Sequence, residues 1–184
     1  MARNELDFYE TPPALVKALL DHVQIEGTVF EPCAGDLAIA RFFPGCLTND
    51  IDHEKETHMN LDAANWKLWQ YLNNPHDWVV TNPPFGRAEE ILPEALKWAK
   101  KGVAFLLRLS YLEPTINRGL WLHEHRHFLS HIIVFNPRPR FKRNKKGQLA
   151  TDSVTVAWFV WEKPHNIYVG TQIHYVRGWM KWEM

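Results

Sequence analysis

Apolar residues near the start of the chain recur at the spacing of an amphipathic helix. One face of this helix would carry Leu15, Val16, Leu19 and Leu20. Residues three and four positions apart share a face, so this spacing predicts a helix that buries one side. Thr11 offers an N-cap hydroxyl and Pro12 suits a first helical turn, so we expect the helix to begin at these residues.

The rest of the chain alternates short apolar runs with amphipathic segments. We predict strands over residues 28–31, 46–50, 77–81, 102–107, 131–135 and 154–161. We predict helices over residues 38–43, 65–72, 88–100 and 115–128. This alternation is typical of an α/β fold with a largely parallel sheet covered by helices on both faces. Ligands of such sheets bind beyond the carboxyl ends of the strands.

The length of 184 residues and a hydrophobic content of 46% predict one domain over residues 1–184. The longest polar stretch, residues 138–152, reads as a basic surface loop. Because 21 basic side chains balance 21 acidic ones, attraction to a polyanion must come from local clusters of charge.

Cys33 and Cys46 are the only cysteines, and their spacing predicts neither a metal site nor a disulfide framework. We find no secretory signal pattern and no apolar run that could span a membrane. The sequence therefore predicts a cytoplasmic protein without a metal.

Five short segments occur in a characteristic order, namely Tyr9-Glu-Thr-Pro12, Phe30-Glu-Pro-Cys-Ala-Gly35, Asp50-Ile-Asp52, Asp62 and Asn82-Pro-Pro-Phe-Gly86. This order resembles that of gamma-type amino-methylating DNA methyltransferases, and the likeness spans roughly residues 7 to 161. The resemblance implies a Rossmann-like class I methyltransferase fold, with a seven-stranded mixed sheet whose last hairpin strand runs antiparallel. It also implies S-adenosylmethionine as the methyl donor and the N6 amine of adenine in DNA as the acceptor.

The resemblance assigns cofactor contacts to Thr11, Pro12, Glu31, Pro32, Ala34, Gly35, Asp50, Asp62 and Asn82. A glycine turn after a strand lets the backbone approach a ligand closely. The family often has a second glycine where Leu37 stands, so we expect a poorer fit of this loop. Asp50 can accept hydrogen bonds from the ribose hydroxyls, and Asp62 from the adenine amino group. A strand-end turn at Asp50 and a helix cap at Asp62 are the structural alternatives.

The acceptor segment consists of Asn82, Pro83, Pro84 and Phe85, which we predict as the catalytic residues. The amino nitrogen of adenine is a poor nucleophile because its lone pair is delocalised into the ring. The Asn82 side-chain oxygen and the Pro83 carbonyl can each accept one amine hydrogen, which favours a pyramidal nitrogen. Two prolines hold these acceptors rigid.

We expect Phe85 to stack on a target base that has left its duplex. Phe141 is our candidate for the second ring of the sandwich, with Phe135 as a weaker one, and core packing is the alternative for both. Arg138, Arg140, Lys142 and Arg143 surround Phe141 with positive charge. We predict that they grip the nucleic-acid backbone.

Other functions remain open at this stage. Similar Asn-Pro-Pro-aromatic segments occur in methyltransferases of ribosomal RNA bases and of a glutamine amide, so the segment indicates a planar nitrogen acceptor rather than one polymer. A catalytically silent domain with the same fold is another possibility. A nicotinamide-dependent reductase is disfavoured because the chain lacks a G-x-G-x-x-G segment.

The chain has no room for the large target-recognition domain of restriction-associated relatives. We therefore expect slight sequence selectivity, or selectivity supplied by a partner or by a second copy in a homodimer. Small forms of this kind resemble enzymes encoded by bacteriophages.

Overall fold

The computed structural model describes residues 10–72, 74–113, 115–139, 141, 155–164 and 169–179. The helices in these residues are α1 (Pro13–His22), α2 (Trp66–Tyr71), α3 (Ala88–Trp98) and α4 (Ile116–His125), with the 3-10 helices η1 (Ala40–Phe42), η2 (Leu109–Leu112) and η3 (Arg126–Phe128). The strands are β1 (Val29–Glu31), β2 (Leu47–Thr48), β3 (Trp78–Thr81), β4 (Gly102–Arg108), β5 (Leu129–Asn136), β6 (Val156–Glu162) and β7 (Gln172–Arg177).

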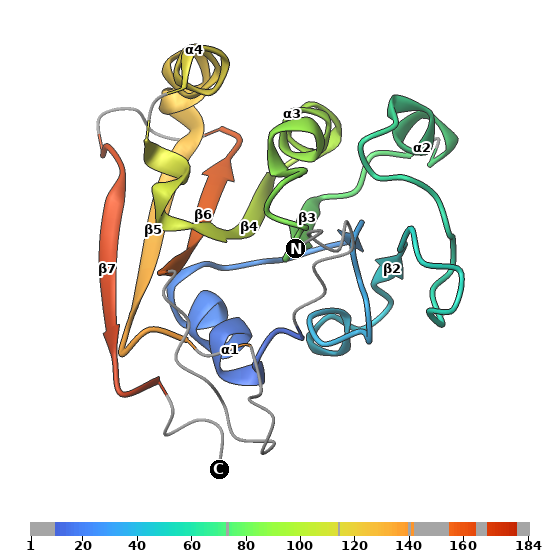
Figure 1. Ribbon diagram of the computed structural model, residues 1–184, viewed down its shortest axis with the longest axis horizontal. Coiled ribbons are helices and arrows are strands. Elements are labelled where there is room, and N and C mark those ends of the chain that lie inside the picture. The colour runs from blue at the N-terminus through green and yellow to red at the C-terminus, as the bar shows by residue number, and fades with distance from the viewer. Residues whose placement is uncertain are drawn as a thin grey trace, which may run out of the picture.

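Within the described residues, seven strands form one sheet in the order β2-β1-β3-β4-β6-β5-β7 (Figure 1). β6 runs antiparallel to its neighbours β4 and β5, and the other pairings are parallel. This confirms the predicted α/β fold with a mostly parallel seven-stranded sheet. The antiparallel strand is β6, the second strand of the β5–β6 hairpin, as expected, and β7 follows it and pairs parallel to β5.

The apolar pattern does not predict β7, although it predicts the other six strands to within a few residues. β7 lies at the edge of the sheet, and only Val176 among its residues is buried. Ile173 is 57% exposed and Tyr175 is 73% exposed. An edge strand with this little burial carries no clear alternation of apolar and polar residues.

Two local predictions are wrong. Thr11 does not cap α1, because Pro12 occupies the N-cap position without a side-chain cap and the Thr11 hydroxyl instead bonds to Asn82. Residues 38–43 form only the short 3-10 helix η1. Leu37 precedes it with a positive φ, and Pro44 follows, so neither end can extend as an α-helix.

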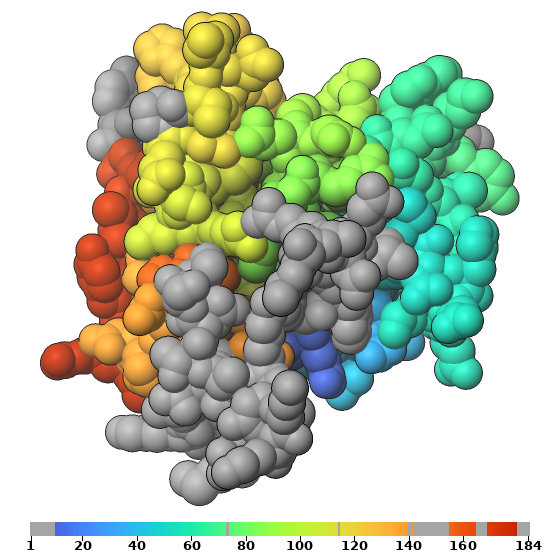
Figure 2. Space-filling view, in the orientation of Figure 1, coloured from blue at the N-terminus to red at the C-terminus, as the bar shows by residue number. Residues whose placement is uncertain are grey.

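Helices cover both faces of the sheet, as predicted. α2, α3 and α4 lie on one face and α1 lies on the other (Figure 1). In the space-filling view, α4, α3 and α2 form one continuous surface along the top (Figure 2). Neighbouring residues of a strand point into opposite clusters, so that Val80 packs on the α1 side and Val79 on the α3 side. Burial on both faces explains why the central strands β3, β4 and β6 are almost continuously apolar.

The order of β1, β2 and β3 creates a crevice at one edge of the sheet. The chain leaves β1 toward β2 on one side and returns to β3 on the other side. All three strands are parallel, so their carboxyl ends meet at the same edge. Such a reversal of strand order is where open α/β sheets bind ligands.

The turn after β1 contains two residues with positive φ. Gly35 has a φ of 48° and Leu37 has a φ of 61°. Leu37 therefore adopts, with a side chain, the left-handed conformation that a glycine adopts at little cost. The expectation of a poorer fit at this position thus has a physical basis in backbone strain.

We predict that Leu37→Gly unfolds at a higher urea concentration than Leu37→Ala. Both variants lose the apolar part of the side chain, but only glycine relieves the left-handed strain, which costs about 1–2 kcal/mol. In helices and strands alanine is more stabilising than glycine by about 0.5–1 kcal/mol. A glycine variant that is more stable than the alanine variant therefore indicates left-handed strain at residue 37. An alanine variant at least as stable as the glycine variant would contradict this interpretation.

Candidate active site

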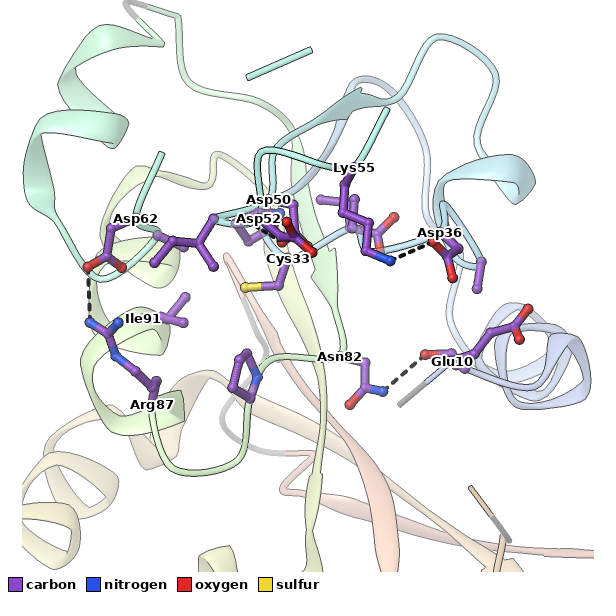
Figure 3. Close-up of a pocket in the computed structure, with 18 residues that line it drawn as sticks. Glu10, Cys33, Asp36, Asp50, Asp52, Lys55, Asp62, Asn82, Arg87 and Ile91 are labelled. Atoms are coloured by element: carbon purple, nitrogen blue, oxygen red, sulfur yellow. Dashed lines mark hydrogen bonds and ion pairs between the residues drawn. The ribbon is translucent and has the colours of Figure 1, made fainter. Parts of the chain in front are cut away.

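A pocket of about 270 Å³ opens in the crevice between β1 and β3 (Figure 3). Eight of the predicted site residues line it: Thr11, Glu31, Pro32, Ala34, Asp50, Asp62, Asn82 and Pro84. The four remaining predicted cofactor and catalytic residues, Pro12, Gly35, Pro83 and Phe85, lie outside the lining. The structure thus brings residues from five separate segments into one cavity at the carboxyl edge of the sheet.

Asp50 is oriented by two backbone N–H groups. Gly35 donates to its Oδ2 atom at 2.8 Å, and Asp52 donates to its Oδ1 atom at 2.9 Å. Each carboxylate oxygen has two acceptor sites, so these bonds hold the side chain while leaving it able to accept from a ligand. Gly35 therefore acts in this site through its amide, which positions Asp50.

Asp62 accepts hydrogen bonds from two groups. The backbone N–H of Ala64 donates to its Oδ1 atom at 2.9 Å, and the Arg87 guanidinium lies 3.2 Å from its Oδ2 atom. Asn65, rather than Asp62, caps α2 through a bond from the N–H of Lys67. The helix-cap alternative for Asp62 is therefore wrong.

Asn82 is fixed by a bond between distant segments. Its side-chain nitrogen donates to the Thr11 hydroxyl at 3.1 Å, and Thr11 is itself only 3% exposed. The amide nitrogen is the donor in this bond and the hydroxyl oxygen is the acceptor. Thr11 thus holds the Asn82 side chain in place within the pocket lining.

Asn49 connects the loops on either side of the pocket, and the sequence reading missed it. Its buried side chain donates to the carbonyls of Pro32 at 2.9 Å and Leu61 at 2.8 Å, and accepts from the N–H of Leu61 at 3.0 Å. Buried amides that satisfy several backbone groups rigidify a structure. In the sequence, only its position one residue before Asp50 indicates that Asn49 lies at the site.

Glu31, at the end of β1, and Cys33, in the loop that follows, are ionisable groups, and Glu31 is buried whereas Cys33 is partly buried. Burial raises the pKa of Glu31 well above its ordinary value, although a backbone hydrogen bond from Ala40 opposes this shift. The Glu31 Oε2 atom has no hydrogen-bond partner among the described residues. Burial, followed by the charges of Asp50 and Glu31, also raises the pKa of the Cys33 thiol. Cys33 is therefore a neutral thiol and a poor nucleophile.

Two ion pairs lie at opposite ends of the pocket (Figure 3). Lys55 contacts Asp36 at 2.8 Å at one end, and Arg87 contacts Asp62 at the other. The sequence did not indicate Lys55 or Arg87, because each pairs with a residue from a different loop. Both pairs are partly exposed, so they contribute little to stability.

Carboxylates outnumber cations in the pocket lining. The acidic residues are Glu10, Glu31, Asp36, Asp50, Asp52 and Asp62, and the basic ones are Lys55 and Arg87. S-adenosylmethionine carries a sulfonium, an ammonium and one carboxylate, so it is a cation overall. The unpartnered buried oxygen of Glu31 and this acidic lining therefore fit that ligand.

Within the described residues, the rings and basic residues predicted to hold the target nucleic acid lie outside the pocket lining. Phe85 is partly buried and packs, like Phe141, against the cluster on the α1 side of the sheet. Phe135 is only 2% exposed and packs edge-on against Trp179, so its ring belongs to the core. Arg138 is exposed, whereas Arg140, Lys142, Arg143 and most of the loop 138–152 lie outside the described residues.

Over the residues that the structure describes, no helix is long and apolar enough to cross a membrane. The same residues contain no group of three or more histidine, cysteine or acidic side chains that could hold a metal ion.

The comparisons with known proteins rest on structure alone. No family model and no curated protein matches the sequence. The chain matches the M protein of the type I restriction enzyme EcoKI with a TM-score of 0.64 and 12% identity, over 96% of this chain and 49% of that one. It matches the methyltransferase subunit of a type I restriction-modification system from Streptococcus thermophilus with a TM-score of 0.62 and 12% identity, over 92% of this chain and 47% of that one.

A third similar structure is the predicted O-methyltransferase Atu636 from Agrobacterium tumefaciens. Its TM-score is 0.55 at 14% identity, over 91% of this chain and 85% of that one. The chain spans about half the length of the restriction-modification subunits that it matches. Together with the strand order, these likenesses show that the chain has the Rossmann-like class I methyltransferase fold.

Proposed function

We propose that this chain transfers a methyl group from S-adenosylmethionine to the exocyclic N6 amine of adenine in DNA. The observation that carries the proposal is the position of Asn82, which Thr11 orients at the mouth of an acidic pocket. Two of the similar structures are methyltransferase subunits of restriction-modification systems, which supports a DNA acceptor. Another is a predicted O-methyltransferase, so the fold alone does not select the acceptor atom.

The cofactor half of the site comprises the loops after β1 and β2. Asp50 would accept hydrogen bonds from the ribose hydroxyls, since its carboxylate is already held just after β2. Asp62, which contacts Arg87, would accept a hydrogen bond from the amino group of the cofactor adenine. When bound, the cofactor would supply an electrophilic methyl on a sulfonium, with a neutral thioether as the leaving group, and the proton lost by the acceptor amine would pass to solvent.

Glu31 would face the cationic end of the cofactor. Its buried Oε2 atom has no hydrogen-bond partner within the described residues, and burial holds its pKa above the ordinary value. A cation at this place would replace the water that the carboxylate has lost. The charge of Glu31 therefore destabilises the folded protein when the cofactor is absent. The same charge favours binding of the cationic cofactor.

The acceptor half of the site requires no strong base. The Asn82 oxygen and the Pro83 carbonyl would each accept one hydrogen of the adenine amine, which directs the nitrogen lone pair toward the methyl donor. Pro83 and Pro84 keep this geometry rigid. The neutral thiol of Cys33 argues against a reaction that begins with a cysteine thiolate. Phe85, with Phe141 as the second ring, would hold the unstacked base.

Two further hypotheses remain part of the proposal. Arg138, Arg140, Lys142 and Arg143 would grip the nucleic-acid backbone. Target selectivity would come from a partner or a second copy of the chain.

We predict that Asn82→Ala lowers the rate of methyl transfer to adenine-containing DNA by about 100-fold or more, because one of two preorganised acceptors is lost. Asn117→Ala, on the exposed surface of α4, is the matched control and should leave the rate unchanged. Single-turnover transfer of a labelled methyl group measures both. Equal rates for Asn82→Ala and the wild type would overturn the assigned role.

We predict that Asp50→Asn weakens S-adenosylmethionine binding by about 10-fold or more, since a hydrogen bond to a charged group is lost. Asp52→Asn makes the same change of charge in the same lining, but its carboxylate bonds to the N–H of Glu54 instead. We expect a smaller loss for this control. Isothermal titration calorimetry distinguishes them, and equal losses would mean that only the overall acidity of the pocket matters.

We predict that Glu31→Gln stabilises the cofactor-free protein at neutral pH and weakens cofactor binding. The folded state raises the pKa of Glu31, so the wild type is most stable when the carboxyl is protonated and loses stability as pH rises above its ordinary value of 4.5 toward the raised one. Glutamine mimics the protonated form, so its melting temperature should fall less over this range. A wild type that instead gains stability relative to Glu31→Gln as pH rises from 4.5 would contradict this reading.

A further inference from the structure

Arg108 lies beside the acceptor segment on a rigid element of the sheet. Thr81, at the end of β3, pairs with Phe105 of β4, so β4 continues three residues further toward the carboxyl edge. The N–H of Leu109 bonds to the carbonyl of Thr155 at 2.8 Å, which fixes the backbone immediately after Arg108. No sequence pattern singles out this arginine, because it stands at the end of an apolar strand.

The Arg108 guanidinium lies over the ring of Phe85. Its Cζ atom is 4.9 Å from the centroid of that ring, a distance typical of a cation–π contact. Its Nε atom is buried and has no hydrogen-bond partner in the described part of the chain. A buried donor without an acceptor is unfavourable, so the described part of the chain places the Arg108 guanidinium here without satisfying all of its N–H groups.

Arg108 also differs from the neighbouring cations in its charge balance. Arg87 pairs with Asp62 and Glu90, Arg118 pairs with Glu89, and Lys55 pairs with Asp36. No ion pair involves Arg108 among the residues that the structure describes. Its charge is therefore not offset by a carboxylate in that part of the chain, although the adjacent pocket is acidic.

We propose that Arg108 binds a phosphodiester group of the DNA strand that carries the target adenine, while Phe85 stacks on the base. The inference rests on the proposed function and deepens it, since it assigns the acceptor to a polyanion rather than to a protein amide. A planar guanidinium can stack on a ring and direct its remaining N–H groups at phosphate oxygens. Arg108 thus couples backbone binding to the ring that holds the base.

The test compares Arg108→Gln with the wild type in DNA binding at several salt concentrations. Loss of one phosphate contact should reduce the slope of log affinity against log salt by about 0.7–0.9 and lower the affinity at low salt by about tenfold. Arg126→Gln is the matched control, because it also removes one arginine charge. Arg126 belongs to η3, which precedes the amino end of β5, whereas Arg108 lies at the carboxyl end of β4. It should leave the slope unchanged.

A second variant separates charge from stacking. Arg108→Lys keeps the charge but not the planar group, so it should retain the salt slope and lower the rate of methyl transfer. Unchanged affinity for S-adenosylmethionine in both variants shows that they are folded. An Arg108→Gln variant with the salt slope of an active wild type overturns this inference, whereas a wild type that methylates no DNA overturns the proposed function itself.

Discussion

The site depends on the parallel pairing of β1 with both β2 and β3. This pairing brings the carboxyl ends of three strands to one edge, although they lie far apart in the sequence. Each strand there ends in a polar segment, so that Glu31, Asp50 and Asn82 surround one cavity. Asn49 then ties the surrounding loops together through the carbonyls of Pro32 and Leu61. A change that separated β1 from β3 would therefore move Asn82 away from Glu31 and open the cavity.

The pocket and the surface beside it differ in charge. Carboxylates dominate the part between β1 and β2, which favours a cationic ligand. Beside it, Arg108 stacks on Phe85 without an ion pair in the described residues, which favours an anionic one. A methyl donor that is a cation and a nucleic acid that is a polyanion would be attracted to adjacent but distinct places. The neutral segment from Asn82 to Pro84 lies where the two regions meet.

The sequence predicted the fold and the strand-end residues because these have strong local signals. Glycine, proline and acidic residues after apolar runs indicate where strands end, and the alternation of elements indicates a parallel sheet. Local signals were insufficient where one side chain had two possible partners. The Thr11 hydroxyl could cap a helix or bond to a distant residue, and only the folded chain shows that it bonds to Asn82.

Contacts between loops escaped the sequence altogether. Arg87 and Asp62 are 25 residues apart, and nothing in either segment indicates their pairing. Arg108 ends an apolar strand and carried no motif, whereas β7 buries too little to show a pattern. Such features depend on tertiary packing, which overrides or supplements local preference.

The most direct test of the central claim is the identity of the methylated product. The protein would be incubated with methyl-labelled S-adenosylmethionine and matched single-stranded DNA, duplex DNA and RNA, and each polymer would be digested to nucleosides for mass spectrometry. The account predicts labelled N6-methyldeoxyadenosine from DNA. Label in an RNA nucleoside alone, or in none of the polymers, would contradict it.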